Sequence, residues 1–255
     1  MSDNRLLTIF HTNDFHDHLT PELGEDIRKA RQAAGPDTIL LDGGDAIGAG
    51  NVGVKLSGER ALSIMSDAGY DAMAMGNREF HMADAVLRHK IANARFPVLS
   101  ANLRYKDQRD AQLPTKPYVI LTTGSGIKVA VMGLTVQMVT ERMTARHLSA
   151  FVFDDPQKVA LETAPRLRQM ADVVVLISHV GYNFDMKLAR ICTDFDIIIG
   201  AHTHIVLENG DTSAGTPVVE TGSFARYLGR ADLAQSGGGR WTLQQASLMP
   251  LKVAK

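Results

Sequence analysis

Short apolar runs recur along the chain between amphipathic stretches, and this alternation restricts the fold more than any other feature of the sequence. Several runs are apolar throughout, which is typical of strands buried on both faces of a sheet. We predict strands at Leu6–Phe10, Thr38–Leu41, Ala72–Met75, Val98–Leu99, Lys128–Met132, Val173–Ile177, Ile197–Ile199 and Pro217–Val219. Two more, Leu228–Ala234 and Trp241–Leu248, should pair through the turn Ser236–Gly239, with Pro250 beyond the second strand.

The stretches between these strands predict helices. A helix over Gly58–Ala68 would have Ser57 as its N-cap and Gly69 as its C-cap. Asp155–Pro156 opens another helix, which continues to about Met170. Further helices are predicted at Met82–Ala92 and Phe184–Thr193, and a polar surface loop at Arg104–Lys116. No repeat or flexible linker divides the sequence, so we expect one α/β domain over residues 1–255.

The overall balance of residues is that of an ordinary globular protein. Apolar residues make up 45% of the 255, charged residues 22%, and the formal net charge is −1. Such a charge indicates no obligatory nucleic acid or anionic membrane partner. The single cysteine, Cys192, excludes an intrachain disulfide. The first ten residues lack the pattern of a signal peptide, and no apolar run reaches the roughly 18–20 residues of a membrane span, so we expect a cytoplasmic protein.

Aspartate, asparagine and histidine follow the ends of five predicted strands. In open α/β sheets, the carboxyl ends of the strands form the edge where ligands bind. The residues in question are Asp14, His16, Asp45, Asn77, His179, His202 and His204.

Each of these short patterns is weak alone. Gly-Asp and Gly-Asn are common in turns, and a lone His179 at a strand end is more often structural. His202 and His204 are stronger candidates, because alternate residues of an extended segment face the same side. All seven together, in this order, predict a metal site.

The donor types indicate which metal. Imidazole, carboxylate and amide donors without a thiolate suit Mn²⁺, Zn²⁺, Fe²⁺ or Co²⁺. Seven ligands are too many for one tetrahedral zinc. They suit two divalent ions that share a carboxylate, which in such sites lie about 3.5–4 Å apart. A hydroxide bridging the ions would be the nucleophile, and phosphate esters the natural substrates, because the ions also neutralise phosphoryl charge.

The sequence resembles the calcineurin-like metallophosphoesterase superfamily over nearly its whole length, and within it the catalytic domain of the bacterial 5′-nucleotidases and 2′,3′-cyclic phosphodiesterases. The motifs that carry the resemblance are Leu7–His16, Gly44–Gly48, Gly76-Asn77, Ser100–Leu103, Ile177–His179, Gly200–His204 and Thr216–Arg230. The resemblance implies an α/β fold of two mixed β-sheets packed as a sandwich and flanked by helices.

The resemblance also implies a division of the ligands. Asp14, His16 and His204 would hold one ion, and Asn77, His179 and His202 the other, with Asp45 bridging them. His11, Asn13 and His18 fit the pattern around Asp14, where hydrogen-bonding support of the ligands is their expected role.

Two positions depart from the family pattern Gly-Asn-His-Glu-Phe-Asp. Arg78 replaces its histidine and His81 replaces its aspartate. Arginine stays protonated, so it cannot be a general acid, but it can bind phosphoryl oxygens bidentately. General acid–base help is typically worth about 10²–10⁴-fold. Our hypothesis is that Arg78 clamps the phosphate while His81 is a substitute proton donor; the alternative for His81 is a surface histidine before a helix.

The leading hypothesis is a dinuclear phosphohydrolase, 5′-nucleotidase-like, that acts on a small phosphomonoester such as a nucleotide. The sequence stops soon after its last predicted strand, so we expect no C-terminal nucleoside-binding domain. The alternatives are a phosphodiesterase on cyclic or linear diesters, a catalytically impaired metal-binding protein with a regulatory role, and, less favoured, a thiosulfohydrolase. The sequence leaves the oligomeric state open.

Overall fold

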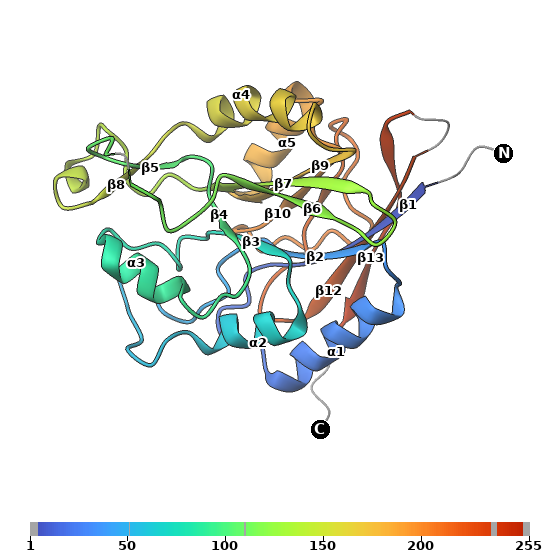
Figure 1. The fold of residues 1–255 in the computed structure, drawn as a ribbon, viewed down its shortest axis with the longest axis horizontal. Helices are drawn as coiled ribbons and strands as arrows, with labels where there is room; N and C mark the ends of the chain where they lie inside the picture. Colours follow the sequence, from blue (N-terminus) through green and yellow to red (C-terminus); the bar gives the residue numbers. More distant parts are fainter. Residues whose placement is uncertain (1–4, 51, 110, 236–238, 252–255) are drawn as a thin grey trace.

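The computed structural model describes residues 5–50, 52–109, 111–235 and 239–251, and within them two mixed β-sheets lie between helices (Figure 1). The first sheet has the order β13 (Trp241–Pro250), β12 (Tyr227–Gln235), β1 (Arg5–Thr12), β2 (Thr38–Asp42), β3 (Ala72–Ala74) and β4 (Val98–Leu99). The second has the order β11 (Val218–Val219), β10 (Ile197–Gly200), β9 (Val173–His179), β7 (Lys128–Thr135) and β6 (Tyr118–Thr122). A small antiparallel pair joins β5 (Leu103–Tyr105) to β8 (Phe151–Phe153).

Each sheet is parallel where it carries the predicted site and antiparallel at one side. β1 to β4 run parallel, whereas β12 and β13 join β1 antiparallel. In the second sheet β7, β9, β10 and β11 run parallel and β6 is antiparallel to β7. Both sheets are therefore mixed, as the resemblance predicts.

The core explains why several strands contain apolar side chains on both faces. Leu7 and Ile9 of β1 join a buried cluster with Val129 and Val175 of the second sheet, so the two sheets face each other. Phe10 points to the opposite side, into a cluster with the helices that cover the first sheet. Because successive side chains of a strand point to opposite faces, both faces must be apolar.

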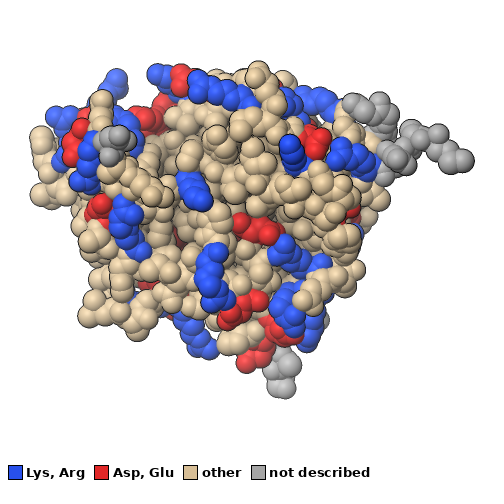
Figure 2. Space-filling model, viewed as in Figure 1, with Lys and Arg blue, Asp and Glu red and all other residues tan. Residues whose placement is uncertain are grey.

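Helices cover the outer face of each sheet and complete four layers (Figure 1). α1 (Pro21–Ala33), α2 (Arg60–Ala68) and α3 (Asp84–Ile91) lie on the first sheet, and α4 (Pro156–Arg168) and α5 (Tyr182–Ile191) lie on the second. A short 3₁₀ helix, η1, spans Thr144–His147. Basic and acidic side chains are interspersed on the face shown in Figure 2. Across the described ranges, no helix combines the length and apolarity needed to cross a bilayer.

Most predicted elements are found, with shifted ends. β1, β9 and β10 extend to Thr12, His179 and Gly200, so the strands carry the chain further toward the site than predicted. α4 begins at Pro156, in agreement with the prediction that Asp155–Pro156 opens this helix, and Asp155 caps it by accepting hydrogen bonds from the N–H groups of Gln157 and Lys158. The four predicted helices correspond to α2, α3, α4 and α5.

Two predictions are wrong, and the start of a predicted loop is shifted. Ser57 does not cap α2, because Gly58 has a φ of +81° in a turn and the helix begins only at Arg60. Gly69 does end that helix, at φ +84°. Pro250 belongs to β13, and this is tolerated because β13 is an edge strand. The predicted loop from Arg104 starts inside β5; of the turn Ser236–Gly239, residues 236–238 lie outside the described residues.

Candidate metal centre

The predicted ligands gather where the strands of both sheets end. Asp14 and His16 follow β1, Asp45 follows β2 and Asn77 follows β3. His179 is the last residue of β9, and His202 and His204 follow β10. The sandwich brings the carboxyl ends of these strands to one edge, so that residues from both sheets meet there.

One set of donors surrounds Asp14. The Nε2 atom of His16 lies 3.5 Å from Asp14 Oδ1 and 3.5 Å from Asp45 Oδ2. The Nε2 atom of His204 lies 3.3 Å from the same Asp14 oxygen. The donor atoms of Asp14, His16 and His204 all lie within 4.8 Å of one another. This is the group that the resemblance assigns to one ion.

A second set surrounds His179. Its Nε2 atom lies 3.4 Å from Asp45 Oδ1 and 3.2 Å from Asn77 Oδ1. The His202 ring lies beside it, with 5.0 Å between the ring centroids. His202 is more exposed than His179 and is joined to the site through its backbone N–H, which donates to Asp14 Oδ2 over 2.9 Å. Asp45 thus presents one oxygen to each set.

Five of the seven residues have a left-handed backbone. Non-glycine residues rarely adopt positive φ, and each costs about 1–3 kcal/mol, a cost usually kept only at functional sites. Backbone hydrogen bonds hold the first two, from Asp14 N–H to Gly44 O (2.9 Å) and from His16 N–H to Asp45 O (3.0 Å). The φ angles are +53° at Asp14, +48° at His16, +56° at Asp45, +76° at His202 and +56° at His204.

Buried polar side chains hold the ligands in place. Asn13 donates to Asp14 Oδ2 (2.8 Å) and accepts from the N–H of Thr221 (2.9 Å). His179 Nδ1 lies 2.8 Å from the carbonyl of Gly43, which fixes the ring with Nδ1 protonated and Nε2 facing the site. These contacts give Asn13 the supporting role expected of it.

His18 and His11, the other two residues expected to support the ligands, make different contacts from Asn13. His18 Nδ1 lies 3.0 Å from the carbonyl oxygen of His16, next to the site. His11 is buried, and its Nδ1 has no hydrogen-bond partner among the described residues. Its ring fills the space over Gly229, where an added Cβ would come within 2.2 Å of Nε2. His11 is therefore a packing residue of the sheet and gives the ligands no hydrogen bond.

Glu79 is a supporting residue that the sequence reasoning missed. Its buried carboxylate accepts hydrogen bonds from the N–H groups of Asp45 (2.9 Å), Ala46 (2.9 Å) and Gly76 (2.8 Å). Glu220 is a second, accepting from the N–H of Ile205 over 2.9 Å, just after His204. Glu79 stands in the same motif as Asn77, which was a usable signal, whereas Glu220 meets Ile205 only in three dimensions.

Arg78 and His81 have different surroundings. The N–H of Arg78 donates to Asp45 Oδ1 over 2.7 Å, and its Nε lies 3.6 Å from Asp45 Oδ2. His81 Nδ1 accepts a hydrogen bond from the N–H of Ala83 (3.0 Å), immediately before α3. Arg78 therefore contacts Asp45, whereas His81 contacts the start of a helix.

Mutual electrostatics keep the carboxylates charged. Burial opposes charge on Asp14, but His16 and His204 outweigh it and lower its pKa. The pKa of Asp45 is likewise lowered, against burial, chiefly by His179. Burial also opposes charge on the His179 ring, yet Asp45 raises its pKa to about 10. Burial and the charge of Asp45 raise the pKa of Glu79 to about 7.

The donor set fits divalent cations. Asp14 Oδ1 and His16 Nε2 are buried and have no hydrogen-bond partner within the described part of the chain. Buried polar atoms normally have one, and a cation between these two would satisfy both. Imidazole, carboxylate and amide donors suit borderline ions.

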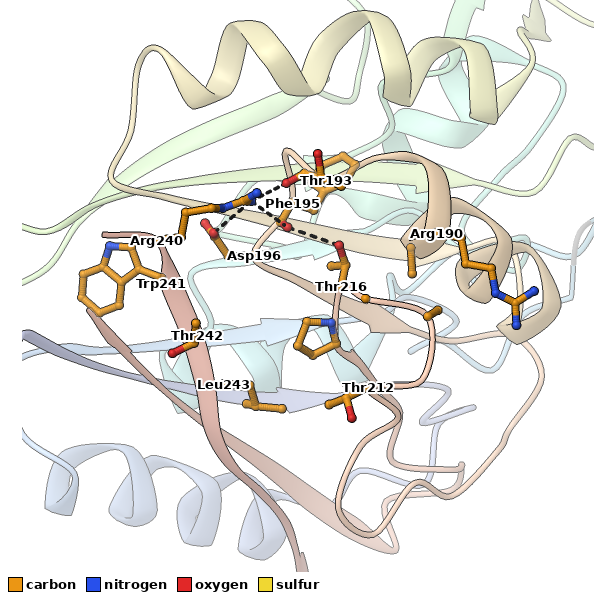
Figure 3. A pocket seen from close by; sticks show the side chains of 14 residues that line it. Arg190, Thr193, Phe195, Asp196, Thr212, Thr216, Arg240, Trp241, Thr242 and Leu243 are labelled. Carbon is orange, nitrogen blue, oxygen red and sulfur yellow. Dashed lines mark hydrogen bonds and ion pairs between the residues drawn. The ribbon is translucent and has the colours of Figure 1, made fainter. Parts of the chain in front are cut away.

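A separate cleft of about 470 Å³ lies near the amino-terminal end of β10 (Figure 3), whereas the ligands follow its carboxyl end. Asp196 lines it and precedes the strand, whereas His202 and His204 follow the strand. Arg240 crosses the cleft to the carbonyl of Thr193 and to Asp196, as Figure 3 shows. This cleft contains none of the predicted site residues.

Comparisons with known proteins identify relatives of similar sequence. Protein UshA of Yersinia enterocolitica is 31% identical over 98% of this chain and 52% of its own length. A 5′-nucleotidase of Vibrio parahaemolyticus is 29% identical over 98% of this chain and 51% of its own length. The chain thus spans about half the length of these curated relatives.

The fold is shared as well. The crystal structure of the calcineurin-like phosphoesterase YfkN from Bacillus subtilis has a TM-score of 0.77 at 25% identity, over 97% of this chain and 91% of that one. The model of the family described as calcineurin-like phosphoesterase matches residues 7–206, which include all seven predicted ligands. The chain belongs to the calcineurin-like phosphoesterase family.

Proposed function

We propose that this protein is a dinuclear-metal-dependent phosphohydrolase of small phosphomonoesters, with nucleotides as the first candidate substrates. One observation carries the proposal: the two oxygens of Asp45 face different ligand sets, Oδ1 toward His179 (3.4 Å) and Oδ2 toward His16 (3.5 Å). Family membership supports the phosphoester chemistry, and the name of the Vibrio relative, 5′-nucleotidase, supports the choice of nucleotides.

Each part of the site has a role in this proposal. Asp14, His16 and His204 would hold one ion, Asn77, His179 and His202 would hold the other, and Asp45 would contact both. Divalent ions bound there would supply a water of lowered pKa and withdraw charge from the phosphoryl group. Manganese, zinc, iron and cobalt all suit these donors.

The chain's own residues position the ester. Arg78 is half-exposed and lies beside Asp45, so its guanidinium can bind phosphoryl oxygens bidentately while its N–H holds Asp45 Oδ1. It cannot donate a proton to the leaving group. His81 stays our candidate for that donor.

The test is metal content together with turnover. We expect two ions per chain after reconstitution, and hydrolysis of nitrophenyl phosphate, whose leaving group needs little acid assistance. Asp45→Ala should reduce the metal content and lower kcat/KM by more than about a hundredfold, the upper end of what residues behind the ligands are worth. The exposed Asp67→Ala is the matched control and should change neither.

Other results of this experiment would support the alternative functions. Turnover of bis-nitrophenyl phosphate without the monoester would make the protein a phosphodiesterase. Bound metal with turnover of neither ester would favour a metal-binding regulatory protein. The cytoplasmic location also stays a proposal, which cell fractionation would test.

A further inference from the structure

Phe224 presents an aromatic ring at the edge of the ligand cluster. The ring centroid lies 5.3 Å from that of His16 and 5.8 Å from that of His204, both in edge-on contact. His18 lies against it at 4.7 Å. The residue is nevertheless 38% exposed, whereas most other phenylalanines of the described chain are buried. A large apolar ring is therefore left partly open to solvent directly beside two predicted ligands.

The backbone at this position is strained. Phe224 has a φ of +63° and Ala225 of +54°. A left-handed backbone is unfavourable for a bulky residue, which is why glycine or asparagine usually occupies such positions. The sequence keeps a phenylalanine there, and burial of its ring does not account for this choice. Strain of this kind clusters at functional sites.

The segment is also fixed to the ligands. The N–H of Phe224 donates to the carbonyl of Asp14 over 2.9 Å. Asn13, which holds the Asp14 carboxylate, also bonds the carbonyl of Gly222 (2.6 Å) and the N–H of Thr221 (2.9 Å). The ring is thus held in a set position relative to Asp14 by three hydrogen bonds around one turn.

A basic group accompanies the ring. The guanidinium carbon of Arg226 lies 5.6 Å from the Phe224 ring centroid. Phenylalanine rings and arginine guanidinium planes are both surfaces on which planar heteroaromatic groups stack. Stacking on an aromatic side chain tolerates different bases, because each has a π face.

We propose that Phe224 is a specificity-determining residue: its ring receives a planar aromatic group on the organic side of the substrate, such as a nucleobase. This inference rests on the proposed phosphohydrolase function. It assigns the substrate class to esters that carry such a group close to the phosphate, and it predicts discrimination against esters of the same sugar without a base.

The test compares adenosine 5′-phosphate with ribose 5-phosphate on the metal-loaded protein, since the second lacks only the base. Phe224→Ala should lower the ratio of the two kcat/KM values about tenfold, within the range that stacking on one aromatic side chain supplies. Phe224→Leu keeps an apolar side chain but removes the aromatic ring, so it should lower this ratio as well. Phe224→Tyr should keep it, and the exposed Leu148→Ala is the control that leaves the ratio at the wild-type value.

Metal content is measured on every variant, because Phe224 touches His16 and His204. Equal losses for both esters would show that the ring only supports the ligands, and an unchanged ratio would show that it meets no base; either result overturns the inference. If the wild-type protein hydrolyses neither ester, the proposed function fails. Calorimetric affinities of the two compounds then decide the inference: a preference for the nucleotide that Phe224→Ala abolishes supports it, and equal affinities for the wild type overturn it.

Discussion

Asp45 is in contact with nearly every part of the candidate site. Its two oxygens face different ligand sets, and the N–H of Arg78 donates to Oδ1 (2.7 Å). Its own N–H donates to Glu79. The carboxylate therefore has fixed partners on several sides, and its oxygens are placed before any ion binds. Two residue-scale predictions follow from these partners, one at Glu79 and one at Arg78.

Glu79→Gln should weaken metal binding. Glu79 accepts from several backbone N–H groups, and an amide would turn a donor toward some of them, which leaves buried groups unsatisfied at about 1–3 kcal/mol. We expect an affinity for Mn²⁺ lower by about 10–100-fold, the range for residues behind metal ligands. Calorimetric titration measures it. Glu208→Gln, at an exposed site, is the control, and equal affinities for both variants would contradict this role of Glu79.

Arg78→Ala should lower kcat/KM for a phosphomonoester by about 10–100-fold, because hydrogen bonds to charged groups are worth about 1.5–3 kcal/mol. Arg78→Lys should recover only part of the loss, since lysine is a point charge without a bidentate fork. His81→Ala should lower kcat/KM most for esters with poor leaving groups, which need a proton donor. If neither Arg78→Ala nor His81→Ala changes turnover by more than about twofold, the shared role proposed for this pair is wrong.

The predicted ligands lie at or just after the carboxyl ends of strands. The strands carry the chain to one edge of the sandwich, and the left-handed residues after β1, β2 and β10 turn it sharply there. Helix caps and strand contacts away from that edge maintain the frame. Two element-scale predictions concern this frame, at the start of α4 and between β1 and β12.

The cap residue of α4 should contribute to the stability of the protein, whereas Ser57, the expected cap of α2, should not. Asp155 accepts from the N–H groups of Gln157 (2.8 Å) and Lys158 (3.4 Å). Asp155→Ala should lower the free energy of unfolding by about 0.5–2 kcal/mol. Ser57→Ala should change it by less than about 0.5 kcal/mol, because Ser57 lies before the turn at Gly58. Urea denaturation measures both, and a larger loss at Ser57 than at Asp155 would contradict the cap assignment.

His11 should make the protein sensitive to acid. Burial lowers the pKa of His11 from 6.5 to about 3. Between these values the unfolded chain binds a proton that the folded chain does not, so stability is complete above pH 6.5 and falls as the pH drops toward 3. The expected slope is at most about 1.4 kcal/mol per pH unit.

His11→Leu should remove this contribution to the slope. Unfolding is measured on metal-free protein, so that the ligand histidines titrate alike in both forms. The exposed His147→Leu is the matched control. A slope that His11→Leu leaves unchanged would show that other groups cause the acid sensitivity.

At the scale of the whole molecule, the sequence is most informative where both faces of a strand are buried. β2 and β9 contain the apolar runs Ile39–Leu41 and Val173–Ile177 because one face meets the other sheet and the other face meets helices, and both strands were predicted. α1 was missed because its buried side consists of little more than Leu23 and Ile27. β6 was missed because it is an edge strand whose residues are only partly buried.

The residues of the site also differ in how far the sequence predicts them. Its predicted ligands could be found because each stands at a strand end, where position in the sequence indicates position in the fold. The support from Glu220 could not be predicted, because Glu220 reaches Ile205 only after the sheets have formed. Asn13 was expected as a support, but its partner Thr221 is known only from the fold. Phe224 gave no signal either, because its importance comes from the neighbouring His16 and His204.

The central claim is that this edge of the sandwich holds two metal ions. Anomalous diffraction from crystals grown with Mn²⁺ tests it most directly. We predict two peaks about 3.5–4 Å apart, one contacting Asp14, His16 and His204, the other contacting Asn77, His179 and His202, and Asp45 touching both. A single peak, or peaks away from these seven residues, would contradict the two-ion site.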